Sequence, residues 1–538
     1  MIRKSWLGLS VLLVAIASTA MGAEFQPMGA LGIGGAGVAR INNAYAAYWN
    51  PAGLAFNEQS MTIPLDVSVG LRVSKGLADN VDRLSKFTEK DSSGNSTFDQ
   101  LKNLNTTGTN PTAVGSMVNL LSVIDDIKTQ KGTLSLNANA AVAMQIKHMA
   151  FGVFGTMEGF AQPLPDLVNV LPSTTGSTTT ASTPQNIWQA AGSPNQIAGY
   201  TPQFFTAAQI QGIASVFSNA NLTNGTITQA QAIGLAQTID AQMAVNPNPT
   251  GLSSSSIYNT VTTVISNQLV AANTGGAAAA NTIDKNKTAV MVKSLAYVEI
   301  PLAYGHPFDL GAYGKLGIGG SIKAVRGRVY QSRVQLVESG DGVKSNDIVS
   351  NLTKNFEEST SLTADLGAFW RYNDWLNVGL VAKNLTSPSF KSPSLKNQHG
   401  QYVDNNGNII TVPIKDEDVK LKPQVRMGIA LEPWSWLTFA ADLDLSKNET
   451  VLSGLDYKNR TLGGGVEFHP GRWFKLRAGM YKNLANADIG PVATAGLTFG
   501  LPWLNFEVDG AYGLETAKYK DKSYPKESKV QGQFNIQF

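Results

Sequence analysis

The chain has 538 residues, no cysteine, and a formal net charge of +3, with 42 Lys and Arg residues against 39 Asp and Glu residues. The absence of cysteine excludes disulfide and thiolate chemistry. The nearly balanced charge gives no case for nucleic acid as a partner, and beyond the first residues no apolar run is long enough for a membrane-spanning helix.

The amino terminus has the layout of a secretory signal peptide. Arg3 and Lys4 precede an apolar run from Trp6 to Ala17, and small residues follow up to Ala23. The run is too short to span a bilayer as a helix. We therefore expect residues 1–23 to be removed and the remainder to be exported. The next residue is not Cys, so nothing indicates a lipid anchor.

Residues 24–59 differ in composition from everything that follows. They combine a glycine cluster with an Asn-Pro-Ala motif: Gly34, Gly35, Gly37, Asn50, Pro51, Ala52. Gly32 completes a G-x-G-x-x-G spacing, but no strand precedes it and no acidic residue follows at the distance that a dinucleotide site requires. A tightly folded segment, which glycine permits, is the better interpretation.

Between residues 60 and 538, apolar and polar residues alternate in many short segments. The clearest lie at 437–445, 461–468 and 530–538. A period of two gives each strand one apolar face and one polar face. Because a soluble β-sandwich would show the same alternation, the connections between strands must decide the class.

Those connections are of two kinds. Short turns alternate with long polar loops, and tryptophans accompany the short turns: Trp370, Trp375, Trp434, Trp436, Trp473, Trp503. This asymmetry is typical of bacterial outer-membrane barrels, in which aromatic residues form a girdle at the membrane interface. We predict an all-β transmembrane antiparallel barrel of about fourteen strands. Both termini then lie on the periplasmic side, and the terminal Phe538 is expected to be an assembly signal for the barrel-insertion machinery.

A large insertion, residues 159–286, interrupts the barrel and falls on the extracellular side. Up to Ile283 its only charged residues are Asp166 and Asp240, and parts of it have apolar residues at helical spacing. Two interpretations remain open. The helices form a surface cap, or they form an external vestibule that captures hydrophobic substrate through Phe204, Phe205 and Phe217.

The inward faces of the strands carry charges of both signs. Buried charges must be paired, so we expect them to pair with each other or with backbone groups rather than to bind substrate. None of the four histidines has an identifiable catalytic partner, and no metal-ligand spacing occurs. We therefore expect no enzymatic activity, no cofactor and no metal.

Residues 31–39, followed by Asn-Pro-Ala-Gly-Leu at 50–54, resemble the amino-terminal signature of the FadL/TodX family of outer-membrane transporters for hydrophobic compounds. They equally resemble TraF-type conjugal transfer proteins, which share this opening. The resemblance to the transporters implies that residues 24–59 fold into the lumen as a plug with Asn50, Pro51 and Ala52 at its centre.

By the same likeness, the chain would be a monomeric channel for passive uptake of a long-chain fatty acid or an aromatic hydrocarbon. Its other partners would be the outer-membrane lipids and lipopolysaccharide. The resemblance to TraF-type proteins implies the alternative, a structural or interaction protein of the outer membrane without transport activity.

Overall fold

The computed structural model describes the chain from residue 24 onward, with gaps. The described ranges are 24–57, 59–74, 76–88, 103–104, 110–171, 173–174, 183–222, 225–245, 251–274, 286–335, 355–394, 401–403, 409–411, 418–449, 458–471, 473–501, 503–519 and 522–538. The predicted signal peptide, residues 1–23, lies outside them.

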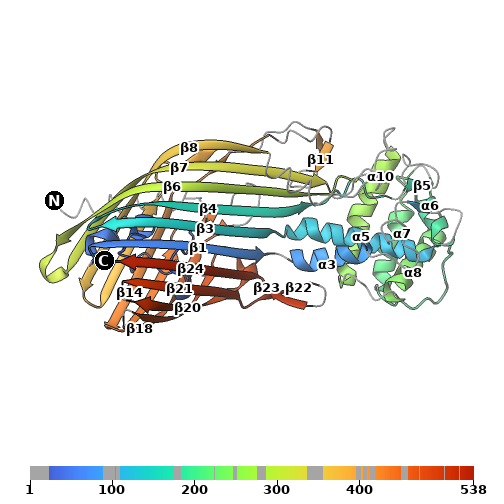
Figure 1. Cartoon of the computed structure of the whole chain (residues 1–538). Coiled ribbons are helices and arrows are strands. Elements are labelled where there is room, and N and C mark those ends of the chain that lie inside the picture. Colours follow the sequence, from blue (N-terminus) through green and yellow to red (C-terminus); the bar gives the residue numbers. More distant parts are fainter. Residues whose placement is uncertain are drawn as a thin grey trace, which may run out of the picture.

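Fourteen antiparallel strands close into a barrel, which confirms the predicted fold class. In chain order they are β1 (Met61–Val73), β3 (Leu134–Ile146), β4 (Met149–Leu164), β6 (Ala289–Asp309), β7 (Lys315–Gln335), β8 (Phe356–Asn373), β9 (Leu376–Lys383), β14 (Gln424–Trp434), β15 (Leu437–Asp444), β18 (Thr461–Gly471), β19 (Phe474–Asn483), β20 (Pro491–Leu501), β21 (Leu504–Gly513) and β24 (Glu527–Gln537). The first and last strands pair and close the wall, with Thr62 opposite Gln537 (Figure 1).

The other strands are short and form two-stranded sheets within the connections. They are β2 (Asn103–Leu104) with β5 (Ser173–Thr174), β10 (Ser389–Phe390) with β13 (Val419–Lys420), β11 (Gln401–Val403) with β12 (Ile409–Thr411), β16 (Asn448–Glu449) with β17 (Lys458–Asn459), and β22 (Thr516–Tyr519) with β23 (Lys522–Pro525).

The period-two pattern explains which side chains the wall presents outward. In β3 and β4 exposed and buried residues alternate along almost the whole strand. The outward residues are large and apolar, and Ile322 and Leu362 each have 70% of their surface exposed. The inward residues are buried, and many of them are polar or small. A closed barrel leaves no backbone edge unpaired, and its apolar outer surface suits a lipid environment.

The two ends of the barrel differ as the connections predicted. The short turns lie at the end where the chain finishes, and the Phe538 nitrogen donates to the Met61 carbonyl over 2.9 Å. We call this the turn end. Trp375, Trp434, Trp436, Trp473 and Trp503 are exposed there, whereas Trp370 is half-buried and its ring nitrogen donates to the Tyr313 carbonyl.

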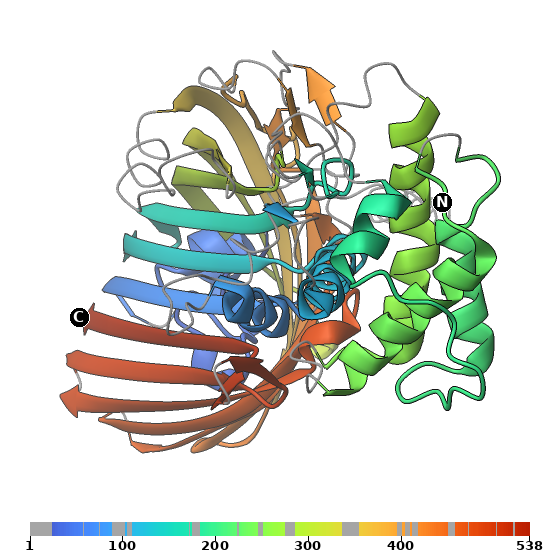
Figure 2. The same ribbon diagram turned by 90° about the vertical axis from the view of Figure 1, so that its right-hand side faces the viewer.

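Helices gather at the opposite end, the loop end, and form a helical cap (Figures 1 and 2). The cap contains α3 (Leu77–Thr88), α5 (Pro111–Gln130), α6 (Pro184–Ala190), α7 (Ala207–Phe217), α8 (Gln229–Val245), α9 (Ser254–Thr260), η3 (Val261–Ile265) and α10 (Ser266–Thr274). It thus combines the predicted insertion with helices from the β1–β3 connection. Among the described residues, no helix has both the length and the apolar character needed to cross a bilayer.

Two acidic residues of the insertion, Asp166 and Asp240, hold backbone turns in place. Buried Asp240 accepts hydrogen bonds from the backbone nitrogens of Gln203, Phe204 and Phe205 and from the Tyr200 hydroxyl. Asp166 accepts from the nitrogens of residues 168, 169 and 287 in the same way. Each carboxylate satisfies several buried donors at once, which explains why these positions are charged in a segment with few charges.

Candidate functional site: the plugged lumen

Residues 24–57 fill the barrel lumen and form the plug. It contains η1 (Leu31–Ile33), α2 (Ala46–Trp49) and η2 (Pro51–Phe56), and nearly all of its residues are buried. Tyr45 and Trp49 are among the most deeply buried large side chains of the molecule. A segment this short cannot form its own core, so its apolar side chains pack against the inner wall.

The Asn-Pro-Ala motif joins two parts of the plug to the wall. The Asn50 side chain accepts a hydrogen bond from the Ala52 nitrogen at the start of η2 and donates to the carbonyls of Val38 and Ala368. Pro51 stands at the first position of η2, where its missing N–H leaves nothing unsatisfied. Since Ala368 belongs to β8, Asn50 connects the plug directly to the barrel.

The plug glycines are required for backbone shape and close packing. Gly34 and Gly35 have φ angles of 69° and 74°, in the left-handed region that other residues rarely adopt. At Gly37 a β-carbon would lie 2.6 Å from the Trp49 ring. All three predicted glycine positions therefore have a local structural reason.

The barrel wall contains a second set of glycines, which the sequence analysis missed. On many neighbouring strands an inward glycine faces the plug so closely that an added β-carbon would collide with it. They are Gly305 on β6, Gly317 and Gly319 on β7, Gly367 on β8, Gly379 on β9, Gly463 on β18 and Gly479 on β19. We call them the wall glycines. An inward glycine on successive strands is the sequence signal that could have shown where the plug lies.

Polar side chains of the wall also bind the plug backbone. Asp442 on β15 accepts from the nitrogens of Gly37 and Val38 at 2.9 and 3.0 Å. Asp509 on β21 accepts from the Gly32 nitrogen at 3.0 Å. These carboxylates hold an irregular segment whose N–H groups have no helix or sheet to pair with.

Several other luminal charges pair with each other, as expected. Lys323 lies 2.9 Å from Asp365 and also contacts Glu299, and Arg477 lies 2.6 Å from Glu467 and 2.8 Å from Glu507. The predicted structural role of the inner charges is therefore confirmed for these groups.

Above the plug, toward the loop end, the inner wall becomes apolar. Phe390, from the connection between β9 and β14, is fully buried against the inner face of β7 and stacks on Tyr297 at 6.5 Å between ring centres. We call this group the inner apolar cluster: Phe160, Leu164, Met291, Leu295, Tyr297, Val325, Val329, Phe390, Val419, Leu421. No pattern in the sequence predicted that this connection folds inward.

The opposite face of the plug borders a polar cavity of about 690 Å³ at the turn end. Its lining includes Arg40 of the plug and Glu467, Lys475 and Glu507 of the wall. Arg40 itself pairs with Glu467 at 3.2 Å. The plug thus lies between the packed inner apolar cluster and this polar cavity.

The predicted capture residues do not share one environment. Phe205 and Phe217 are buried in the apolar core of the helical cap, and Phe204 is only partly buried against it. Phe204 and Phe205 contact each other edge to face at 4.9 Å. Of the three, Phe204 alone presents surface to a ligand in this conformation.

The fold and the filled lumen define the class: a membrane-spanning barrel closed by its own amino-terminal segment. Residues 47–444 match the family described as F plasmid transfer operon, TraF, protein, and the chain belongs to this family. This confirms one of the two resemblances seen in the sequence. No curated protein matches the chain at a significant level.

Solved structures of the other resembling family are also similar to this chain. They include the P. putida toluene transporter TodX (9% identity, TM-score 0.40, 96% of this chain and 99% of that one) and the Ralstonia pickettii toluene transporter TbuX (13%, 0.41, 94% and 97%). A Pseudomonas aeruginosa FadL homologue matches with 12% identity and a TM-score of 0.39, over 96% of this chain and 98% of that one.

Proposed function

We propose that this protein is an outer-membrane channel for passive uptake of hydrophobic compounds, of the long-chain fatty acid or aromatic hydrocarbon class, with the plug as its gate. The observation that carries the proposal is the inner apolar cluster. A water-filled pore for polar solutes has no use for an apolar inner wall, whereas a site for hydrophobic ligands is lined mainly by such side chains.

The proposed route begins at the loop end. A hydrophobic compound is captured near Phe204 on the helical cap and passes to the inner apolar cluster, where movement of Phe390 makes room for it. The plug then rearranges around Asn50, Pro51 and Ala52. The compound leaves past the polar cavity, which faces the periplasm in this orientation.

The plug contacts set how such a gate behaves. Hydrogen bonds to charged groups each contribute about 1.5–3 kcal/mol, and Asp442 and Asp509 alone hold three backbone N–H groups of the plug. Release of the whole plug is therefore costly. We expect a local rearrangement of the segment around η2, which is held to the wall mainly by packing against the wall glycines and by Asn50.

Uptake by cells tests the proposal. Cells that carry the protein should take up one or more members of a panel of fatty acids and aromatic hydrocarbons faster than cells without it. The variant Asn50→Ala with Pro51→Ala should change that rate. The matched control is Pro194→Ala with Asn195→Ala, which alters the same residue types in the cap and should leave uptake unchanged. Equal uptake across the panel with and without the protein would reject a transport role.

Membership of the TraF family favours a second candidate. In this alternative the protein has a structural or interaction role in plasmid transfer, and the helical cap presents the contact surface. It predicts unchanged uptake together with a lower frequency of plasmid transfer when the protein is removed. Measuring both quantities in the same strains separates the two functions.

A further inference from the structure

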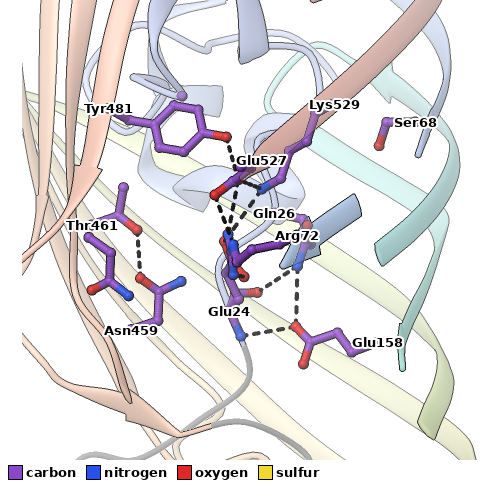
Figure 3. A network of polar contacts seen from close by, with 12 residues as sticks. Glu24, Gln26, Ser68, Arg72, Glu158, Asn459, Thr461, Tyr481, Glu527 and Lys529 are labelled. Carbon is purple, nitrogen blue, oxygen red and sulfur yellow. Dashed lines mark hydrogen bonds and ion pairs between the residues drawn. The ribbon is translucent and has the colours of Figure 1, made fainter. Parts of the chain in front are cut away.

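The plug begins in a buried cluster of charges inside the barrel. Glu24, the first described residue, forms a bidentate ion pair with Arg72 at 2.9 Å, and Arg72 also binds Glu527 at 2.8 Å (Figure 3). Lys529 lies 3.4 Å from Glu24 and 3.3 Å from Glu527. Burial alone would raise the pKa of the Glu24 carboxyl, but Arg72 and Lys529 hold it below its usual value, so Glu24 is ionised.

Glu158 on β4 joins this cluster through the backbone. Its Oε1 accepts a hydrogen bond from the Glu24 nitrogen at 3.0 Å and another from the Gln26 side chain at 3.2 Å. Its Oε2 is buried and has no hydrogen-bond partner among the described residues. The side chain is 1% exposed, so water does not replace the missing donor at the surface.

The direct contacts of the cluster leave one negative charge uncompensated. Glu24, Glu158 and Glu527 face Arg72 and Lys529, which makes three carboxylates against two cations. A buried carboxylate without a counter-charge is unfavourable. A group with one positive charge and a further N–H beside Glu158, at the nitrogen of Glu24, would balance the cluster.

We propose that removal of the signal peptide between Ala23 and Glu24 supplies this group, and that the new α-ammonium of Glu24 pairs with Glu158 to hold the plug in the lumen. Hydrolysis of the Ala23–Glu24 amide consumes one water and leaves a carboxylate on Ala23. The Glu24 nitrogen, previously an amide with one hydrogen and no charge, becomes an ammonium with three hydrogens. One of those hydrogens keeps the contact with Glu158 Oε1, and the positive charge balances the cluster.

This inference does not depend on transport, because it concerns how the processed chain is held. It requires cleavage directly before Glu24, because only an ammonium at that residue lies beside Glu158. An ammonium on any other residue would be displaced by roughly 3.5 Å per residue, and the uncut chain would leave the Glu158 charge unpaired. Processing and docking of the plug are thereby linked in one ion pair.

The first test is the mass and amino-terminal sequence of the mature protein from outer membranes. A mature chain that begins at Glu24 is expected, and one that begins at any other residue would overturn the proposal. The second test is the rate at which an amine-reactive ester labels the α-amino group in detergent-solubilised barrel. Labelling of the native protein should be slower than that of the unfolded protein by about tenfold or more.

Two variants separate the ion pair from a general packing effect. Glu158→Gln keeps the shape but removes the charge and should increase labelling in the folded barrel by about tenfold. The same change at an exposed outward carboxylate, Glu358→Gln, should have no effect. A chain with one glycine inserted between Ala23 and Glu24 should also be labelled rapidly, although Glu158 is intact. Unchanged labelling in either the Glu158 variant or the insertion variant would refute the pairing.

Discussion

The wall glycines allow the plug to be loosened without altering the barrel. Gly319 on β7 faces inward, and a β-carbon added there would lie 2.5 Å from the Pro51 carbonyl oxygen and closer still to the Ala52 nitrogen. Gly320, the next residue, faces outward, and its added β-carbon would meet Leu366 and Asp365 at the ordinary distances of 3.4 and 3.5 Å. Gly319→Ala and Gly320→Ala are therefore a matched pair with the same chemical change on the same strand.

The expected effect follows from the overlap. Ordinary contact requires η2 to move away from β7 by roughly 1 Å, and overpacking of this kind costs about 1–3 kcal/mol. Because the strain is relieved when the plug leaves its position, the population with the plug displaced should rise by about 5- to 150-fold. Gly320→Ala should change it by less than about twofold, as expected for a surface substitution.

Hydrogen exchange measured by mass spectrometry in detergent is a suitable assay. Exchange of the amides of residues 50–56 should be faster in Gly319→Ala by that factor, while strand amides and heat-modifiable gel migration stay as in the wild type. If the two alanine variants exchange alike, the glycines do not make room for the plug. If Gly319→Ala loses heat-modifiability, the residue is needed by the barrel itself, and the reasoning also fails.

Three other predictions concern the cap and the last strand. Asp240→Asn should lower the stability of the cap by about 2 kcal/mol, because a charged acceptor for three backbone N–H groups is lost. Faster amide hydrogen exchange confined to residues 197–206 would show this loss, and unchanged exchange would contradict it. Burial, together with Asp240, raises the pKa of Tyr200 above its usual value of 10.0. The neutral hydroxyl therefore contributes its full stabilisation below pH 10, and this stabilisation is lost as the pH rises above 10. Thermal unfolding of the cap at pH 9 and pH 11 measures this loss, which Tyr200→Phe should remove. Deletion of Phe538 should reduce the amount of barrel inserted and leave unfolded chain in the periplasm, and normal insertion would count against an assembly role.

The barrel could be predicted from the sequence because its signals are local. Alternation along each strand and tryptophans at the short turns depend only on neighbouring residues, and they predicted the number of strands. The described chain does not begin at the turn end, because Glu24 pairs with Arg72 near the opposite end of β1. The plug, expected at residues 24–59, was placed by a resemblance rather than by pattern. Its contacts with Asp442 and Asp509 join residues several hundred positions apart, which no local period records.

The errors and omissions have the same cause. The apolar face of 207–217 was visible as a helical period, but a period cannot distinguish a face that lines a ligand site from one that packs on another helix. Phe217 lies in a core that α5 completes from a different connection. Phe390 was missed because a single inward aromatic residue within a polar loop leaves no periodic signal.

The central claim is that hydrophobic compounds pass through the barrel when the plug moves. The most direct measurement is the rate at which a labelled long-chain fatty acid or aromatic hydrocarbon enters vesicles whose outer leaflet is lipopolysaccharide. The protein should accelerate the passage of at least one such compound, Gly319→Ala should change the rate, and Gly320→Ala should behave like the wild type. Rates equal to those of protein-free vesicles for the whole panel, in all three proteins, would contradict the account.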